Sequence, residues 1–563
     1  MSDTDKSNGS LLPAANRPDE LVFLSLGGAG EIGMNLNLYG YAGKWLMVDC
    51  GVTFGDNSTP GIDVVLPDPD FIVERRDALA GLVVTHAHED HIGAIPYIWR
   101  QFRCPVYATP FTAAVLRAKL AENDLLREVP IHEVPLSGAF NVGPFEIDLI
   151  TLTHSIPEPN AVVIRTPVGA VLHTGDWKFD PAPLVGPAAD EAALRRLGDD
   201  GVLAMICDST NALHSGEAGS EADVRETLID LVGRCRNRVA VACFASNIAR
   251  LESIAAAAAE HDRHVALIGR SLWRMERAAR ETGYLQDLPA FVSEEDAGYL
   301  PRDKVVLVCT GSQGEPRSAL ARIAGDDHPH VVLEEGDAVI FSSRIIPGNE
   351  LAIGRLQNKL ARLGVEVLTE HDHPSIHVSG HPARDELIRM YQMVRPRVAI
   401  PVHGEARHLI AHARLAEECQ VPTSIVAENG EIVRLGPGPA EIIGEVQVGR
   451  LGVDGKQLRP LGSMALRDRT RISFNGSAVA TLVLDAKGQL LAPPQVTVHG
   501  IADEDDELLD VLEDDVGRAV GGLPASDRRD DDAVREAARV AIRRTLKAAA
   551  GKRPVTDVHV VRV

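Results

Sequence analysis

The sequence contains no apolar run long enough to cross a membrane and no segment typical of a leader peptide. A transmembrane helix needs roughly 20 consecutive apolar residues, and no stretch approaches that length. The first residues are polar and lack both the basic start and the apolar segment of a signal peptide. We therefore expect a disordered tail over residues 1–19, and a cytoplasmic protein with no membrane partner.

Paired cysteines are also missing. No two cysteines form a C-x-x-C pair, and most of them lie in apolar segments. This excludes the common cysteine-based zinc and redox motifs and predicts buried free thiols. The seven cysteines are Cys50, Cys104, Cys207, Cys235, Cys243, Cys309 and Cys419.

Positive charge is scarce as well. The chain has 57 Lys and Arg against 80 Asp and Glu, a formal net charge of -23. A protein that coats nucleic acid non-specifically depends on clustered Lys and Arg, so the balance argues against that class. Part of the acidic excess lies in residues 503–517, and a metal site would gather further carboxylates whose charge the cations offset. A nucleic-acid substrate bound in a local groove therefore stays compatible with the composition.

The length of 563 residues predicts several α/β domains. The sequence up to about residue 220 is mostly short strand-like runs. From there it alternates between amphipathic helices and buried strands, and the pattern of short strand-like runs resumes near residue 361. The middle domain is therefore expected to be inserted into the first, and a strand is expected over 472–485. The predicted ranges are 20–220 and 361–450 for the split domain, 221–360 for the insert, 451–465 for a linker and 466–563 for a small α/β domain.

The strongest chemical motif is H-A-H-E-D-H, which follows the apolar segment L-V-V. It places His86, His88, Asp90 and His91 within six residues on a turn that leaves a predicted strand. Imidazole nitrogens and carboxylate oxygens that converge on one point bind divalent cations. The alternative is a solvated polar turn, which would make no use of three imidazoles.

Three further polar residues, His154, Asp176 and His403, lie where later strands are expected to end. One such residue alone is more often a cap or a satisfied polar group, but together they complete two sets of four ligands. The expected first site is His86, His88, His154 and Asp176, and the expected second site is Asp90, His91, His403 and Asp176. Asp176 would bridge two ions, with a water between them as the nucleophile.

This H-x-H-x-D-H pattern with isolated His, Asp and His resembles the metallo-β-lactamase superfamily. D-S-T-N at 208–211, H-V-S-G-H at 377–381 and P-V-H-G-E at 401–405 resemble the motifs of its β-CASP group. Together with G-G-A-G-E-I-G-M-N, F-A-S-N-I-A-R, T-G-S-Q-G-E-P and I-P-G-N-E, they resemble the ribonuclease J family over residues 21 to about 450. The implied fold is α/β: an αββα sandwich with an inserted β-CASP domain and a small C-terminal α/β domain.

The resemblance implies a two-metal ribonuclease that leaves 5′-phosphate products in RNA processing and decay. It would act as a 5′ to 3′ exonuclease with endonuclease activity, with zinc as the ion or manganese as the alternative. Asp90 would be catalytic as well as a ligand, and His381 would protonate the leaving oxygen while Asp208 orients it. Ser246 and Asn247 would contact the RNA backbone. The pocket for a nucleotide phosphate would be formed by His377, Val378, Ser379, Gly380 and His381.

The implied partner is single-stranded RNA with a 5′-monophosphate, and the family further implies a homodimer or homotetramer and RNA-degradation partners. A DNA-directed β-CASP nuclease and a small-ester or lactone hydrolase share the metal motif and stay open as alternatives. A non-catalytic scaffold would be expected to lack some of the ligands.

Two glycine-rich segments have competing interpretations. Gly28, Gly30 and Gly33 satisfy G-x-G-x-x-G, but a strand-like run follows where a dinucleotide site needs a helix, which favours a tight turn between two strands. The resemblance would place this turn at the edge of the metal cleft. Residues 310–315 form either a plain loop or one that approaches a phosphate.

Overall fold

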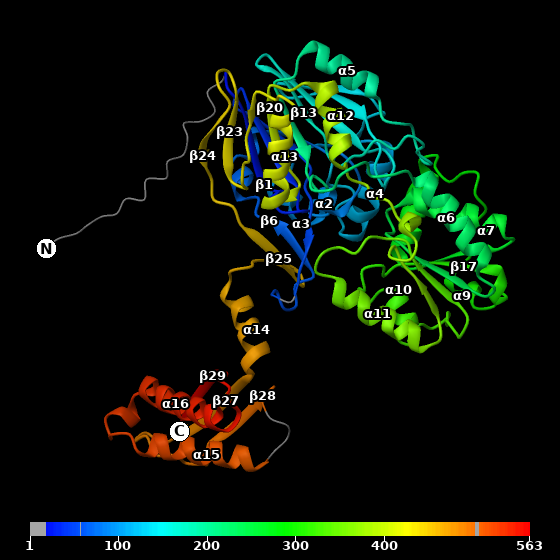
Figure 1. Ribbon diagram of the computed structural model, residues 1–563. Helices are drawn as coiled ribbons and strands as arrows, with labels where there is room; N and C mark the ends of the chain where they lie inside the picture. Colours follow the sequence, from blue (N-terminus) through cyan, green and yellow to red (C-terminus); the bar gives the residue numbers. More distant parts are fainter. Residues whose placement is uncertain (1–18, 57, 502–505) are drawn as a thin grey trace. The chain divides into compact units, whose positions relative to one another are not determined.

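The structure is a computed structural model that describes residues 19–56, 58–501 and 506–563 (Figure 1). The chain forms two compact units: the first joins the residues up to Thr53 with Leu66–Gly449, and the second joins Phe54–Val65 with Arg450–Val563. None of the helices described has both the length and the apolar character needed to cross a membrane. The cysteines described are free thiols, as predicted, and only Cys235 and Cys419 are partly exposed.

The first unit contains an eight-stranded sheet that is covered on both faces. Every residue of its third strand is buried, as expected of a strand between two apolar layers. The strand order is β24 (Glu441–Glu445), β23 (Glu431–Gly436), β1 (Leu21–Gly27), β3 (Leu36–Tyr41), β4 (Lys44–Val48), β7 (Leu79–Val83), β8 (Val106–Ala108) and β9 (Ile131–Glu133). The helices of this part of the chain are α1 (Asp70–Val73), α2 (Glu89–Ile92), α3 (Ile95–Phe102) and α4 (Pro110–Glu122).

A seven-stranded sheet packs against the first through a shared apolar core that includes Phe23, Leu46 and Ile206. Its order is β10 (Ala139–Val142), β11 (Phe145–Thr151), β12 (Asn160–Thr166), β13 (Gly169–His173), β14 (Ala204–Asp208), β20 (Val398–Val402) and β22 (Thr423–Ser424). Leucines on three helices cover its other face: α5 (Glu191–Asp200), α12 (Arg384–Val394) and α13 (Ala406–Glu418). The result is the αββα sandwich that the motifs predicted.

A parallel five-stranded sheet, the inserted domain, lies in the chain between β14 and β20. Its order is β16 (His264–Ile268), β17 (Val305–Cys309), β15 (Val239–Ala242), β18 (Ala338–Phe341) and β19 (Glu366–Leu368). Its helices are α6 (Glu221–Arg234), α7 (Ile248–Glu260), α8 (Arg270–Glu281), α9 (Glu294–Ala297), α10 (Ala319–Ile323) and α11 (Glu350–Arg362). Because β14 and β20 pair directly, with Asp208 opposite Val402, the insert begins and ends at one edge of the sandwich.

The second unit has its own core, formed where helices cover a three-stranded sheet. The sheet order is β28 (Gln495–His499), β27 (Ser477–Leu484) and β29 (Val555–Arg562), and the covering helices are α15 (Asp506–Gly521) and α16 (Asp531–Ala550). A further sheet has the order β26 (Gln457–Pro460), β25 (Arg450–Asp454), β6 (Val64–Pro67) and β5 (Thr53–Phe54).

The strand expected over 472–485 is wrong in its first residues, which belong to helix α14 (Met464–Asn475). The helix is rich in strong helix formers, and Gly476 ends it with φ 71°, a backbone conformation in which glycine is favoured. Ile472 and Phe474, the apolar residues that suggested the strand, are exposed on the helix.

Candidate active site

The H-A-H-E-D-H segment follows strand β7, as predicted, and its last residues, Asp90 and His91 among them, lie in helix α2. His86 and His91 are buried, whereas His88 and Asp90 are half-buried. Gly51 packs against this segment so closely that an added Cβ would lie 1.7 Å from the carbonyl oxygen of Asp90. The loop after β4 therefore fixes the backbone that carries the ligands.

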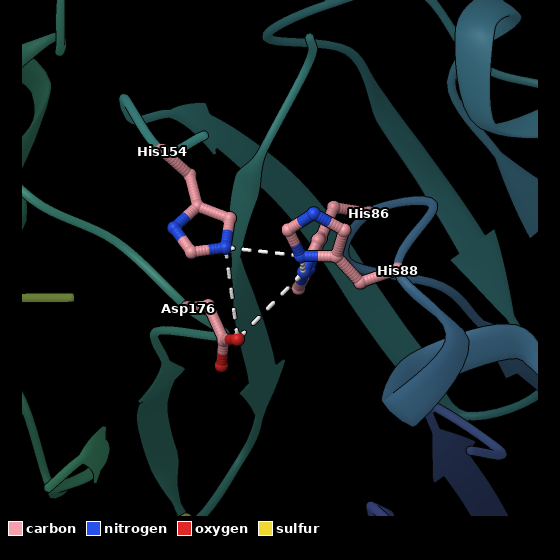
Figure 2. A group of neighbouring side chains, drawn as sticks. All are labelled: His86, His88, His154 and Asp176. Carbon is pink, nitrogen blue, oxygen red and sulfur yellow. Dashed lines mark hydrogen bonds and ion pairs between the residues drawn. The ribbon is translucent and has the colours of Figure 1, made fainter. Parts of the chain in front are cut away.

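The first predicted ligand group is brought together, with its side chains pointing toward one another (Figure 2). The Nδ1 atom of His88 lies 3.1 Å from Nε2 of His86 and 3.1 Å from Nε2 of His154. Oδ2 of Asp176 lies 3.8 Å from each of the latter two nitrogens. Three imidazoles and one carboxylate thus face a common point.

The second predicted group converges on the same carboxylate oxygen. Oδ2 of Asp176 lies 3.2 Å from Nε2 of His91 and 3.6 Å from Nε2 of His403. Oδ2 of Asp90 lies 3.6 Å from each of these nitrogens. The two groups therefore share Asp176, and all seven predicted ligands belong to one or both of them.

These donor sets fit divalent metal ions. Ligand distances of about 2.0–2.1 Å around a tetrahedral ion give ligand-to-ligand edges of about 3.3–3.4 Å, close to the spacings in both groups. In the described part of the chain, Nε2 of His403 and Oδ1 of Asp176 are buried and have no hydrogen-bond partner. Burying a polar atom without a partner costs free energy of folding, and a bound cation would supply the partner that these two residues lack.

The electrostatics of the groups point the same way. Burial lowers the pKa of His86 and His154 well below the usual value and lowers the pKa of His88 to about 4, so all three are neutral, as metal-binding imidazoles must be. Burial also acts to lower the pKa of His91, but the carboxylates of Asp176 and Asp90 outweigh it and raise that pKa well above its usual value. The second group therefore attracts positive charge.

Residues that sequence reasoning missed hold the ligands in place. Asp49 accepts a hydrogen bond from Nδ1 of His91 over 2.7 Å, and its other oxygen accepts from the backbone N–H of Thr85 over 2.8 Å. Asn35 lies 2.9 Å from Nδ1 of His403 through its Nδ2 atom. The signal available in the sequence for Asp49 was an aspartate directly after the largely apolar segment K-W-L-M-V.

The loop that carries His403 is fixed by the glycine-rich segment near the start of the chain. His403 has a left-handed backbone, with φ 53°, and its N–H donates to the carbonyl of Gly28 over 2.6 Å. The short strands β2 (Ala29–Gly30) and β21 (Gly404–Glu405) pair beside it. Strand β3 follows the glycines, so the segment is a turn at the metal groups, as predicted, and lacks the helix of a dinucleotide site.

The predicted general acid, His381, and its predicted partner, Asp208, lie next to Asp176. Nδ1 of His381 is 2.8 Å from Oδ2 of Asp208 and 3.8 Å from Oδ2 of Asp176. Burial acts to lower the pKa of His381, but Asp208 and Asp176 outweigh it and raise it to about 9. These three side chains are also close enough to hold an ion. The distances therefore fit His381 both as a general acid and as a metal ligand.

The remaining residues of H-V-S-G-H have different surroundings. Oγ of Ser379 accepts from Nδ2 of Asn211 over 2.7 Å and from the N–H of His381 over 3.1 Å. The carbonyl of Gly380 accepts from Nδ1 of His154, which leaves Nε2 of that imidazole for a metal.

Gly380 also has no room for a side chain, because a Cβ would lie 2.6 Å from the ring of His154. Nδ1 of His377 lies 3.5 Å from Nη1 of Arg250. Val378 packs against Gly219, where an added Cβ would lie 2.9 Å from Cγ1 of the valine. The segment thus supports the metal groups through the contact of Gly380 with His154.

Asn247, predicted to contact RNA, is buried and serves as the N-cap of α7. Its Oδ1 accepts from the N–H of Arg250 over 2.8 Å, and its Nδ2 donates to Glu221 over 3.3 Å. Its polar atoms are therefore engaged within the inserted domain, whereas the neighbouring Ser246 is half-buried.

Four family models match the chain. They are described as "Beta-lactamase superfamily domain" over residues 44–195, "Ribonuclease J, beta-CASP domain" over 236–360, "Zn-dependent metallo-hydrolase RNA specificity domain" over 373–426 and "Ribonuclease J C-terminal domain" over 464–563. A solved structure of a protein of unknown function from Enterococcus faecalis has a TM-score of 0.51 at 16% identity and covers 74% of this chain and 100% of its own, which supports the fold alone.

Curated relatives cover almost the whole chain. Ribonuclease J of Sinorhizobium meliloti is 46% identical over 552 residues, which is 97% of this chain and 98% of the relative. Ribonuclease J of Mycolicibacterium smegmatis is 40% identical over 531 residues, which is 94% of each chain. With these identities over nearly the full length of both chains and with the matching domain models, the chain belongs to the ribonuclease J family, whose members are metal-dependent hydrolases of RNA phosphodiester bonds.

Proposed function

We propose that this chain uses two divalent ions, zinc in the first instance and manganese as the alternative, to cut single-stranded RNA into 5′-phosphate products. The observation that carries the proposal is the position of Asp176 Oδ2, which belongs to both ligand groups at once. When bound, such ions supply Lewis acidity, which makes water a better nucleophile at neutral pH and offsets the charge of phosphate oxygens.

His381 is proposed as the general acid, with Asp208 as its positioning residue. Because Nδ1 of His381 donates to Asp208, the second ring nitrogen is left to give a proton to the departing 3′-oxygen. The side chain of His381 is 22% exposed, whereas that of Asp208 is fully buried. The imidazole can thus meet substrate while its carboxylate partner stays shielded from water.

A 5′ to 3′ exonuclease needs to recognise the end of its substrate, and we place that pocket at Ser379. Its oxygen accepts two hydrogen bonds from the protein, so its own hydroxyl hydrogen is available for a phosphate oxygen. His377 and the backbone at Gly380 flank it. Internal cleavage requires no seated end, so endonuclease activity would depend less on this pocket.

The test uses RNA and DNA of one sequence, labelled at either end and carrying a 5′-monophosphate, triphosphate or hydroxyl. We expect processive shortening of 5′-monophosphate RNA, loss of activity on chelation, and recovery with zinc or manganese at two ions per chain. One ion per chain at full activity would contradict the two-ion proposal, and equal cleavage of DNA would contradict the RNA preference.

A further inference from the structure

The cations around H-V-S-G-H differ in whether a carboxylate offsets their charge. Lys178 is buried, with Nζ 3.1 Å from Asp180, and Arg250 is buried, with Nη2 3.0 Å from Glu221. Arg344 is exposed, and no carboxylate lies within ion-pair distance of it in the described part of the chain. Its charge is therefore the one that is available to an anion.

Arg344 reaches from the inserted domain to neutral groups of the sandwich domain. Its Nη1 lies 3.5 Å from Oδ1 of Asn211, and its Nη2 lies 3.3 Å from Nε2 of His214. Burial, followed by the charge of Arg344, lowers the pKa of His214, so that ring is neutral. Long hydrogen bonds to neutral acceptors are weak, and a phosphate could replace them at small cost.

Asn211 connects this guanidinium to the proposed end pocket. Its Nδ2 donates to Oγ of Ser379 over 2.7 Å and to the carbonyl of His381 over 3.0 Å. One amide side chain thus contacts both Arg344 and the serine hydroxyl. A phosphate near Ser379 would lie within reach of the arginine.

Gln313, in T-G-S-Q-G-E-P, holds the backbone that carries Arg344. Its Nε2 donates to the carbonyl of Arg344 over 2.8 Å, and its Oε1 accepts from the N–H of Ile346 over 2.9 Å. Gly314 packs against α11, where a Cβ would lie 2.6 Å from the carbonyl carbon of Ala352. Residues 310–315 therefore act as a brace for the loop at 344–349.

We propose that Arg344 binds the terminal 5′-phosphate of the RNA substrate and that Gln313 is its positioning residue. This inference rests on the proposed function, because it assigns a further residue to the end pocket at Ser379. A phosphate monoester carries about -1.5 to -2 charge at neutral pH, which a hydroxyl and backbone amides cannot offset. The planar guanidinium offers paired donors that match two phosphate oxygens.

The test compares Arg344→Gln with the unaltered chain on 5′-monophosphate RNA, on 5′-hydroxyl RNA and on bis(p-nitrophenyl) phosphate. The small ester needs the metal groups but has no RNA end. We expect the KM for 5′-monophosphate RNA to rise by about 10- to 100-fold, which corresponds to the loss of one charge-assisted hydrogen bond. The KM values for the other two substrates should not change. Arg344→Lys should recover part of the loss, and Arg355→Gln, an exposed arginine on α11, should change nothing.

Gln313→Ala should raise the same KM by a smaller factor, and the double variant should be no worse than Arg344→Gln alone. Additive losses in the double variant would overturn the positioning role of Gln313. An unchanged end preference in Arg344→Gln, or an equal rise in KM for both RNA ends, would overturn the role of Arg344. Failure of the proposed function shows in the unaltered chain instead, as equal KM values for the two RNA ends.

Discussion

The replacement of Asp49 by asparagine is the sharpest test of how the metal ligands are held. Asp49 is fully buried, and its two oxygens accept from Nδ1 of His91 and from the N–H and hydroxyl of Thr85. Its φ is 64°, a left-handed conformation that asparagine tolerates well. The substitution therefore keeps size and backbone and removes only the charge and one acceptor.

The expected effect follows from the hydrogen bonds. Asparagine has one oxygen, so if that oxygen stays with the N–H of Thr85, its NH₂ group meets Nδ1 of His91. This favours the tautomer with the proton on Nε2, the nitrogen that faces Asp176, and a protonated nitrogen cannot bind a metal. Loss of a hydrogen bond to a charged group costs about 1.5–3 kcal/mol, or about 10- to 150-fold in metal affinity.

The assay is metal content at a series of buffered zinc concentrations, measured beside RNA turnover and a melting curve without metal. We expect Asp49→Asn to shift half-occupancy to at least about 10-fold higher zinc, with a comparable loss of turnover at fixed metal. Asp326→Asn is the matched control, because Asp326 is exposed and has a similar left-handed φ of 55°. Unaltered zinc affinity in Asp49→Asn would refute the reasoning, whatever happens to turnover.

Three further predictions concern the groups around this centre. Asp176→Ala should lose bound metal and abolish turnover while the chain stays folded; near-normal turnover would remove the case for a shared ligand. His381→Ala should keep its metal and lose about 10²- to 10⁴-fold in rate, and a drop in metal content measured by the same zinc titration would identify it as a ligand instead. Ser379→Leu should impair shortening of 5′-monophosphate RNA much more than internal cleavage, as followed on RNA labelled at each end. Gly380→Ala should impair both equally, because its Cβ would strike His154; parallel losses in both variants would reduce Ser379 to a structural turn.

The metal groups could be predicted from sequence because their signal is local. Four ligands lie within six residues, and the other three follow strands of one sandwich, whose edges bring them together. Asn35 and Asp49 carry no such spacing, since each makes its contact through the fold and is one of many polar residues beside a strand. Asn247 shows the opposite case, because a residue in a family motif can be engaged as a helix cap.

The inserted domain separates, along the chain, the two residues assigned to proton transfer. Asp208 ends β14, just before the insert, and His381 lies just after it, 173 residues along the chain. Their 2.8 Å contact therefore joins the chain on the two sides of the insert. The metal ligands at residues 86–91, 154 and 176 precede the insert, and among them His154 also donates to the carbonyl of Gly380, which follows it. Damage inside the insert, such as loss of the buried pair Arg250 and Glu221, should thus reduce the rate before it reduces binding of metal at the first group.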